Sequence, residues 1–217
     1  MRGFIVMAMF SASLAHASWS DYEEVRKLEV DAGGVSEFVI DAGAGSMTVN
    51  GDAGAKSIEV TATIQVNTGD EEKARKAIAK RLTLTLDQKG DRAILKSFFN
   101  NGMWGGTNGS VMLEIIMPTG IALRINDGSG SILVEDVQAD IAINDGSGSI
   151  RIYNVGAVDI DDGSGSIDIR NANGDVVIVD GSGSINVDDV ENDLIIVEDG
   201  SGGVSVSDVR GTVELDT

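Results

Sequence analysis

The sequence predicts an all-β fold, a β-solenoid (β-helix or roll) with coils of about 18 residues. One phrase, Asp-Gly-Ser-Gly-Ser-Ile, begins at Asp127, Asp145, Asp162 and Asp180, and a degraded copy begins at Asp199. These aspartates are 18, 17, 18 and 19 residues apart, which is the near-constant period of a repeat architecture. Apolar and polar residues alternate on both sides of the phrase, as they do in β-strands.

The alternation fixes which residues of each repeat are expected to face the core. The predicted inward positions before the bend are Leu123 and Ile125, Ile141 and Ile143, Val158 and Ile160, Val176 and Ile178, and Ile195 and Val197. Those after it are Ile132 and Val134, Ile150 and Ile152, Ile167 and Ile169, Ile185 and Val187, and Val204 and Val206. The corner that closes each repeat adds one more apolar residue, which is Val137, Val155, Val190 or Val209, with Ala172 as the exception.

Strands this short can share one core in two ways. In a solenoid, equivalent strands stack in parallel about 4.8 Å apart and like residues form columns. In an antiparallel meander, each glycine-rich bend would instead close a β-hairpin. The solenoid is favoured because stacking like on like requires the same residue at the same station, whereas a meander requires no such identity.

Residues 1–17 are predicted to be a secretory signal peptide. Arg2 gives the positive start, Gly3 to Leu14 an apolar run, and Ala15 to Ala17 a small-residue cleavage site. The run is too short to span a bilayer and no later stretch approaches that length, so no transmembrane segment is expected. Cleavage after Ala17 predicts an exported, soluble protein of the periplasm or the cell exterior.

Residues 18–118 are expected to form a β-rich region that leads into the repeats of residues 119–217. Asp41 to Met47 resembles a worn copy of the repeated phrase and predicts a first coil or cap. Its expected inward residues are Phe38, Ile40, Met47 and Val49, and Ile58 to Val66 alternates as a further strand.

An insert interrupts this region. Acids at residues 70–72 and bases from Lys73 to Lys80 suit a helix dipole, which predicts a short helix over about 70–81. Leu82 to Leu86 and Ala93 to Phe98 are predicted to form a hairpin around a turn at residues 88–91. A Gly- and Asn-rich loop follows at residues 100–110, and then a strand from Val111 to Met117.

Composition excludes several classes of chemistry. His16, the only histidine, leaves with residues 1–17, and the sequence has no cysteine. Histidine acid–base catalysis, Ser-His-Asp triads, thiol nucleophiles, His or Cys metal sites and disulfides are therefore excluded from the mature chain. No catalytic residue, metal ligand or cofactor site is assigned.

The chain is strongly acidic. Its formal net charge is −19, and loss of Arg2 with the signal leaves −20. Residues 119–217 contain 4 Arg, no Lys and 20 Asp plus Glu, a net charge of −16. This field disfavours nucleic acid and anionic membrane surfaces as partners.

The order of these features resembles the putative-adhesin family, exported β-strand-repeat proteins of unknown function that are related in style to head-GIN domain proteins. The resemblance covers most of the mature chain and depends on three features: the strand–helix–hairpin insert, the strand ending in Met117-Pro118-Thr119-Gly120, and the repeated Gly-Ser-Gly-Ser-Ile phrase. It implies a β-solenoid in the bacterial cell envelope, and it implies no ligand or catalytic residue.

A column of aspartates is the first candidate site, because Asp127, Asp145, Asp162, Asp180 and Asp199 would stack in a solenoid. Neighbouring charges about 4.8 Å apart would repel by roughly 3 kcal/mol at an effective dielectric near 20. Either each carboxylate accepts backbone N–H bonds from the following Gly and Ser in an Asx-turn, or hard cations such as Ca²⁺ lie between the coils. The Asx-turn is favoured because the known calcium roll places its aspartate after the glycines and has about half this period.

Two other groups of residues invite a functional interpretation. Ser131, Ser149, Ser166 and Ser184 would form an outward row, which is more typical of a solvated sheet face than of a lattice binder. The acidic pairs Asp161-Asp162 and Asp188-Asp189 suggest carboxylate chemistry on a polysaccharide. Adjacent strand residues point to opposite faces, however, so the enzymatic reading is only the alternative.

Outward apolar residues suggest a covered patch. Val177 and Val179 are expected to lie beside Ile196 of the next coil, with the insert of residues 70–99 as their cover and a partner protein as the second choice. Residues 213–217 are predicted to form a last strand whose open edge supports end-on pairing with another copy or an envelope partner.

The sequence therefore predicts a non-catalytic, exported β-solenoid that acts as an adhesin or envelope scaffold. An envelope protein or a glycan is the expected partner. The alternatives are a carbohydrate-active enzyme with clustered carboxylates and a Ca²⁺-stabilised surface module.

Overall fold

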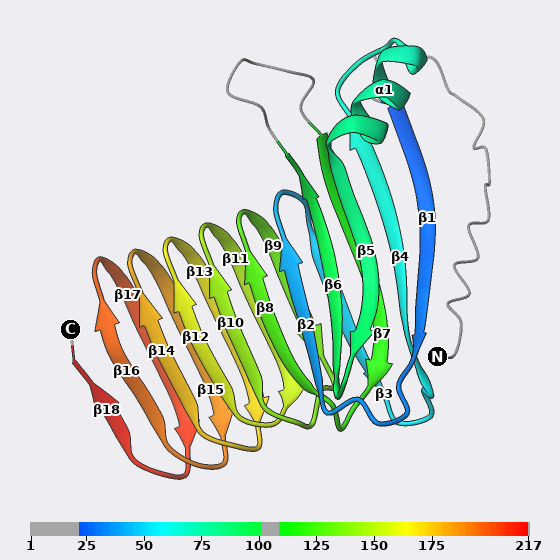
Figure 1. Cartoon of the computed structure of the whole chain (residues 1–217). Helices are drawn as coiled ribbons and strands as arrows, with labels where there is room; N and C mark the ends of the chain where they lie inside the picture. Colours follow the sequence, from blue (N-terminus) through cyan, green and yellow to red (C-terminus); the bar gives the residue numbers. More distant parts are fainter. Residues whose placement is uncertain (1–21, 101–108, 217) are drawn as a thin grey trace.

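Two β-sheets of nine strands each make up almost all of the computed structural model, which describes residues 22–100 and 109–216 (Figure 1). The predicted signal peptide and most of the predicted loop at residues 100–110 lie outside the described residues. Among the described residues, no helix has the length and apolar character that a membrane crossing requires.

The two sheets run in the same order along the molecule. Sheet 1 consists of β1 (Tyr22–Asp31), β4 (Ser57–Val66), β7 (Gly109–Pro118), β3 (Met47–Asp52), β9 (Gly130–Glu135), β11 (Gly148–Val155), β13 (Gly165–Ala172), β15 (Gly183–Val190) and β17 (Gly202–Val209). Sheet 2 consists of β5 (Leu82–Lys89), β6 (Arg92–Phe99), β2 (Glu37–Ala42), β8 (Ala122–Asp127), β10 (Ile141–Asp145), β12 (Val158–Asp162), β14 (Val176–Asp180), β16 (Leu194–Asp199) and β18 (Val213–Leu215).

Each repeat contributes one strand to each sheet. The chain passes from β8 through the glycine-rich bend to β9, and then through a corner to β10, so equivalent strands are parallel neighbours. Ile143 pairs with Ile125 on one side and with Ile160 on the other, which places like on like. The predicted parallel stacking is confirmed, and the bends do not close antiparallel hairpins.

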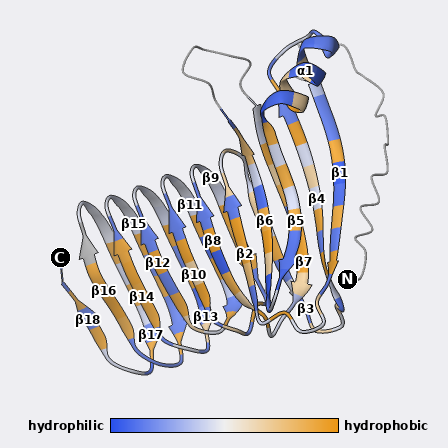
Figure 2. Cartoon of the chain, viewed as in Figure 1, coloured by the Kyte–Doolittle hydropathy of each residue, from blue (hydrophilic) through white to orange (hydrophobic). Residues whose placement is uncertain are grey.

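The predicted inward residues from Leu123 to Val190 form the core of the repeats, and Val204, Val206 and Val209 of β17 are partly buried against it. Both residues flanking the bend, such as Ile125 and Ile132, are fully buried, and so are the corner residues Val155 and Ala172. Figure 2 shows the resulting alternation of hydrophobic and hydrophilic bands along the strands. A fully buried Val or Ile side chain contributes about 1.5–3 kcal/mol, so the columns account for a large part of the stability.

The last repeat departs from the prediction. Leu194 and Ile196 are the buried residues of β16, whereas Val197 is 47% exposed, so the expected inward pair Ile195 and Val197 is wrong. The physical reason is a register shift between β14 and β16. Ile178 pairs with Ile196, but the next residue, Val179, pairs with Glu198, so Val197 has no partner in β14. The extra residue of the 19-residue period is accommodated there as a β-bulge.

The worn copy at residues 41–47 behaves as the first layer of the same stack. Strands β2 and β3 pair in parallel with β8 and β9, and an isolated bridge joins Ala44 to Ser129 across the bends. The four expected inward residues are all buried; they are Phe38, Ile40, Met47 and Val49.

The helix and hairpin form as predicted. Helix α1 (Glu71–Arg81) begins after Asp70, whose side chain accepts a hydrogen bond from Lys73 N at 3.0 Å. It buries Ala74, Ala77 and Ile78, and it lies at the end of the stack beside β4 and β5. Strands β5 and β6 are antiparallel.

The insert does not cover Val177 and Val179, so this expectation is wrong. Strand β6 pairs edge-on with β2, and the backbone hydrogen bonds of that parallel ladder make the hairpin an extension of sheet 2. Strands β2, β8, β10 and β12 therefore lie between β6 and β14.

Glycine is required at one station of every bend. Gly130, Gly148, Gly165 and Gly183 have φ between 142° and 154°, a region that L side chains rarely adopt. A Cβ added to Gly165 would overlap the carbonyl oxygen of Gly148 in the preceding repeat. The second glycine of the phrase is therefore conserved between repeats of this chain because successive bends approach each other along their backbones.

Replacing Gly165 by Ala tests this contact. We expect Gly165→Ala to lower the free energy of unfolding by more than about 3 kcal/mol, because it combines a strained φ with a backbone clash. Urea denaturation measures the change. Gly120→Ala is the control, since nothing lies within 4 Å of a Cβ there, and it should stay within about 0.5 kcal/mol of wild type. Equal effects of the two variants would contradict the close approach of the bends.

Candidate functional site

The aspartate column lies inside the molecule. Four of its members, Asp127, Asp145, Asp162 and Asp180, share the inward side of their strands with the apolar residues at alternate positions before them, as in β10 with Ile141, Ile143 and Asp145. The exposed fractions of Asp127, Asp145, Asp162 and Asp180 are 8%, 3%, 2% and 0%. Adjacent members pair in register, so the four carboxyl groups form a row through the bends of successive repeats.

Local hydrogen bonds hold one oxygen of these carboxyl groups. The backbone N–H groups of Ser147, Ser164 and Ser182 donate to Oδ1 of the aspartate two residues earlier, at 3.4, 3.2 and 3.1 Å. The predicted Asx-turn is therefore confirmed for Asp145, Asp162 and Asp180. The second oxygens, Oδ2 of Asp127, Asp145 and Asp162, are buried without a hydrogen-bond partner among the described residues.

Burial changes the protonation of the column. Desolvation, reinforced by the charge of Asp145, raises the pKa of Asp127 to about 7. The same two causes, with the charge of Asp180 in addition, raise the pKa of Asp162 to about 6. Desolvation also raises the pKa of Asp145. As the pH falls through 7 and 6, protonation of Asp127 and Asp162 therefore relieves the expected repulsion, a solution that the sequence-based choice between Asx-turns and cations did not include.

No three acidic side chains among the described residues gather closely enough to hold a metal ion. Coordination of Ca²⁺ takes six to eight oxygen ligands, and the inward neighbours of these aspartates along their strands are apolar, such as Ile141 and Ile143 before Asp145.

The outward row of serines is placed as expected. Ser149 pairs with Ser131 and Ser166, and Ser166 pairs with Ser184, on the outer face of sheet 1. Beside this row, Arg170 makes two hydrogen bonds to Asp168, at 3.0 and 2.9 Å, and its guanidinium lies 5.7 Å from the ring centroid of Tyr153. This face is flat, polar and of mixed charge.

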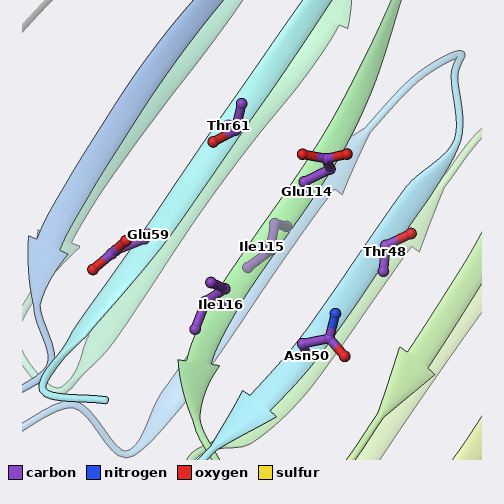
Figure 3. A pocket seen from close by; sticks show the side chains of 7 residues that line it. All are labelled: Thr48, Asn50, Glu59, Thr61, Glu114, Ile115 and Ile116. Carbon is purple, nitrogen blue, oxygen red and sulfur yellow. The ribbon is translucent and has the colours of Figure 1, made fainter.

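A shallow hollow of about 290 Å³ opens on the outer face of sheet 1, across β3, β7 and β4 (Figure 3). Figure 3 shows Thr48 and Asn50 on β3, Glu114 and Ile116 on β7, and Glu59 and Thr61 on β4. Thr61 pairs with Glu114 and Glu59 pairs with Ile116, so the two carboxylates are diagonal neighbours on adjacent strands. Both are exposed, and Ile116 is 44% exposed.

The acidic pairs do not join into a dyad. Asp161 is exposed on the outer face and Asp162 is buried, as the strand alternation requires. Asp188 lies on the outer face of β15, whereas Asp189 has φ of 58° at the corner.

The sequence analysis missed a second polar column, at the corners. Five residues have positive φ there; they are Asp136, Asn154, Asn171, Asp189 and Asp208. Asn154 donates to Asp136 Oδ1 at 3.2 Å, and Asn171 donates to Asn154 Oδ1 at 2.8 Å. The signal was present, because each corner residue of the core is preceded by Asn or Asp, the non-glycine residues that best tolerate this conformation.

Comparisons with known proteins find structural neighbours alone. The chain is similar to a putative cell adhesion protein from Clostridium sporogenes ATCC 15579, with a TM-score of 0.44, 14% identity and coverage of 90% of this chain and 98% of that one. It is also similar to a putative adhesin from Parabacteroides distasonis ATCC 8503, with a TM-score of 0.39, 14% identity and coverage of 88% and 96%. No family model and no curated protein matches.

The raised pKa values predict a stability that decreases as pH rises. The folded chain keeps protons on Asp127 (pKa about 7) and Asp162 (pKa about 6) that the unfolded chain releases near pH 4. Their stabilising contribution is therefore complete below about pH 4 and is lost as pH rises through 6 and 7. We expect the Tm to be at least about 4 °C lower at pH 8 than at pH 5.

Calorimetric scans of variants separate this effect from the general charge of the chain. Asp127→Asn combined with Asp162→Asn should flatten the pH dependence, because an amide resembles the protonated carboxyl group. Asp159→Asn, an exposed change on the same strand as Asp162, should leave the slope unaltered. A double variant with the wild-type slope would show that the column does not bind the protons.

Removal of divalent cations tests the cation hypothesis for the same column. We expect neither Ca²⁺ nor EDTA to change the Tm at pH 7, because the carboxyl groups are buried and one oxygen of Asp145, Asp162 and Asp180 already accepts a backbone hydrogen bond. Differential scanning fluorimetry measures the effect. A rise of several degrees with Ca²⁺ that is absent from the Asp127→Asn, Asp162→Asn variant would establish the cation-stabilised module instead.

Proposed function

We propose that this chain is an exported, non-catalytic β-solenoid that acts as an adhesin or as a scaffold of the cell envelope. In this proposal residues 1–17 are removed after Ala17, residues 18–118 form the first layers with their helix and hairpin, and residues 119–217 form the repeat stack. The product acts in the periplasm or on the cell surface, and its partner is an envelope protein or glycan.

The observation that carries the proposal is the separation of reactive groups from accessible surface. The aspartates with raised pKa, Asp127, Asp145 and Asp162, are sealed between the sheets, where no polymeric substrate reaches them. The accessible surface consists instead of straight rows of side chains at strand spacing on two rigid faces. Such rows suit the recognition of another surface. Catalysis requires instead a confined site with fixed polar groups.

The carbohydrate-active enzyme stays the second candidate because of the hollow in Figure 3. Glu59 and Glu114 could flank a sugar there. Glycoside hydrolysis needs two carboxyl groups held on either side of the scissile bond, however, and both side chains lie exposed on one flat sheet surface. The hollow therefore supports this function less well than binding.

The names of the two solved structures concern adhesion. The proposed function depends on the surface of this chain alone, and not on those names.

End-on pairing through β17 and β18 stays a prediction. Val213 and Leu215 of β18 are 43% and 50% exposed and align with Leu194 and Ile196, which gives such pairing an apolar contact.

Adhesion and hydrolysis can be measured on the same material. We expect beads that carry residues 18–217 to be retained on immobilised bacterial envelope preparations. Soluble protein should release no reducing ends from purified envelope polysaccharides. The physical reason is that the exposed rows can bind while the perturbed carboxyl groups are inaccessible.

Beads coated with serum albumin, another acidic protein, control for charge alone. Retention no greater than that of albumin would contradict the adhesive role. Release of reducing ends that disappears in Glu59→Gln or Glu114→Gln would establish the enzyme instead.

A further inference from the structure

The outer face of sheet 2 carries aliphatic side chains on β14 and β16, where β8 and β12 carry polar ones. The aliphatic block consists of Val177 and Val179 on β14 and Ile195 and Val197 on β16. Val177 pairs with Ile195, whereas the bulge places Val197 outward between Ile196 and Glu198, where it is 47% exposed. The expectation that Ile196 lies beside Val177 on this face is therefore wrong, since Ile196 is buried.

The repeats provide their own comparison. In β12 the residues that pair with Val177 and Val179 are Asp159 and Asp161, and both are exposed. In β10 the equivalent stations hold Ala142 and Asn144. Because these strands have the same parallel pairing and the same buried core without an outward Val or Ile, the fold does not require the block.

An acidic hollow adjoins the block on the side of β12. It encloses about 170 Å³ over the small side chain of Ala142, and its polar lining comprises Arg124, Asn126, Asn144, Asp159 and Asp161. Arg124 is paired with Glu37 at 3.1 Å, and Asn144 donates to Asp161 at 3.4 Å. With the Arg124 charge compensated, Asp159 and Asp161 give the hollow a negative charge.

We propose that this face, from the hollow over Ala142 to Val197, binds a segment of a partner protein that carries a Lys or Arg beside aliphatic side chains. The cation occupies the hollow against Asp159 and Asp161, and the aliphatic groups cover the block. The inference rests on the binding role proposed above and names the class of partner for it.

Charge and desolvation favour this occupant over the alternatives. A second copy that bound through the same face would bring the carboxylates of Asp159 and Asp161 toward their own equivalents, which repels. A glycan laid on the block would bury hydroxyl groups against Val and Ile without hydrogen-bond partners, which is unfavourable. A basic and aliphatic peptide segment complements both parts of the surface.

Selection of random linear peptides on the full mature chain tests the proposal. We expect the enriched peptides to contain Lys or Arg next to aliphatic residues. Fluorescence anisotropy of a labelled enriched peptide should show affinity about tenfold lower for the Val177→Thr, Val179→Thr, Ile195→Thr variant, which keeps β-branched side chains. Asp159→Asn with Asp161→Asn should lower the affinity about fivefold and reduce its salt dependence.

Leu133→Thr is the matched control, because Leu133 is an outward aliphatic residue of sheet 1. It should bind the peptide as wild type does. Circular dichroism checks the fold of each variant, and the aspartate pair decides the outcome if the triple variant does not fold. Enriched peptides without a cation, or affinities unchanged in both sets of variants, would overturn the proposal.

The envelope assay identifies the class of partner. Retention of wild-type beads should be lost when the envelopes are treated with protease and should survive periodate oxidation of their glycans. The opposite pattern overturns the proposal in favour of a glycan, and a wild-type dimer that the triple variant abolishes overturns it in favour of a second copy. If triple-variant beads are retained like wild type, the inference fails while adhesion stands; if wild-type beads are not retained, the proposed function itself fails.

Discussion

The structure depends on one constraint, that each repeat lays its backbone in register on the repeat before it, with the bulge in β16 as the one shift among the described repeats. Parallel pairing then places equivalent atoms about 4.8 Å apart along the whole stack. A residue position that stacks without conflict in one repeat does so in all of them. A steric or electrostatic conflict at a position recurs in each repeat and must be relieved in the same way each time. The identical residues of the phrase are these repeated solutions.

Three columns illustrate the constraint with different chemistry. At the bend, the backbone of Gly165 passes so close to Gly148 that only glycine fits. The positive φ of Gly165 also favours glycine. At the corner, Asn154 and Asn171 take up a left-handed conformation and use their amides to bond to one another. Where an inward strand position holds a carboxyl group, stacking would place like charges side by side. Burial raises the pKa of Asp127 to about 7 and that of Asp162 to about 6, so these groups lose their charge as the pH falls through this range.

Much of this architecture follows from the sequence because its signals are local and repeated. Alternation identifies the inward side of β10 from Ile141 and Ile143 alone, and the same parity applied to Asp145 would have predicted that it is buried. The bulge after Ile196 is different. A 19-residue period states that one residue is extra, but several positions along β16 satisfy alternation, and only packing against β14 selects Val197 as the residue turned outward. The insert was misplaced for a related reason, since the helix and hairpin are visible in the sequence while the edge to which β6 pairs is a property of the assembled sheet.

The same constraint separates the two roles of a strand residue and so directs the search for function. An inward residue is held by its equivalents above and below, and a change there alters the stack. An outward residue pairs with equivalents that differ from repeat to repeat, as Ala142, Asp159 and Val177 do, and the fold is indifferent to which of them is present. The fold therefore does not explain which residues occupy the outer faces. An aliphatic side chain exposed to water at such a position is unfavourable until something covers it. In a stack whose core is uniform, specificity for a partner can reside only in this outer variation, and Val177 to Val197 is where it departs furthest from the other repeats.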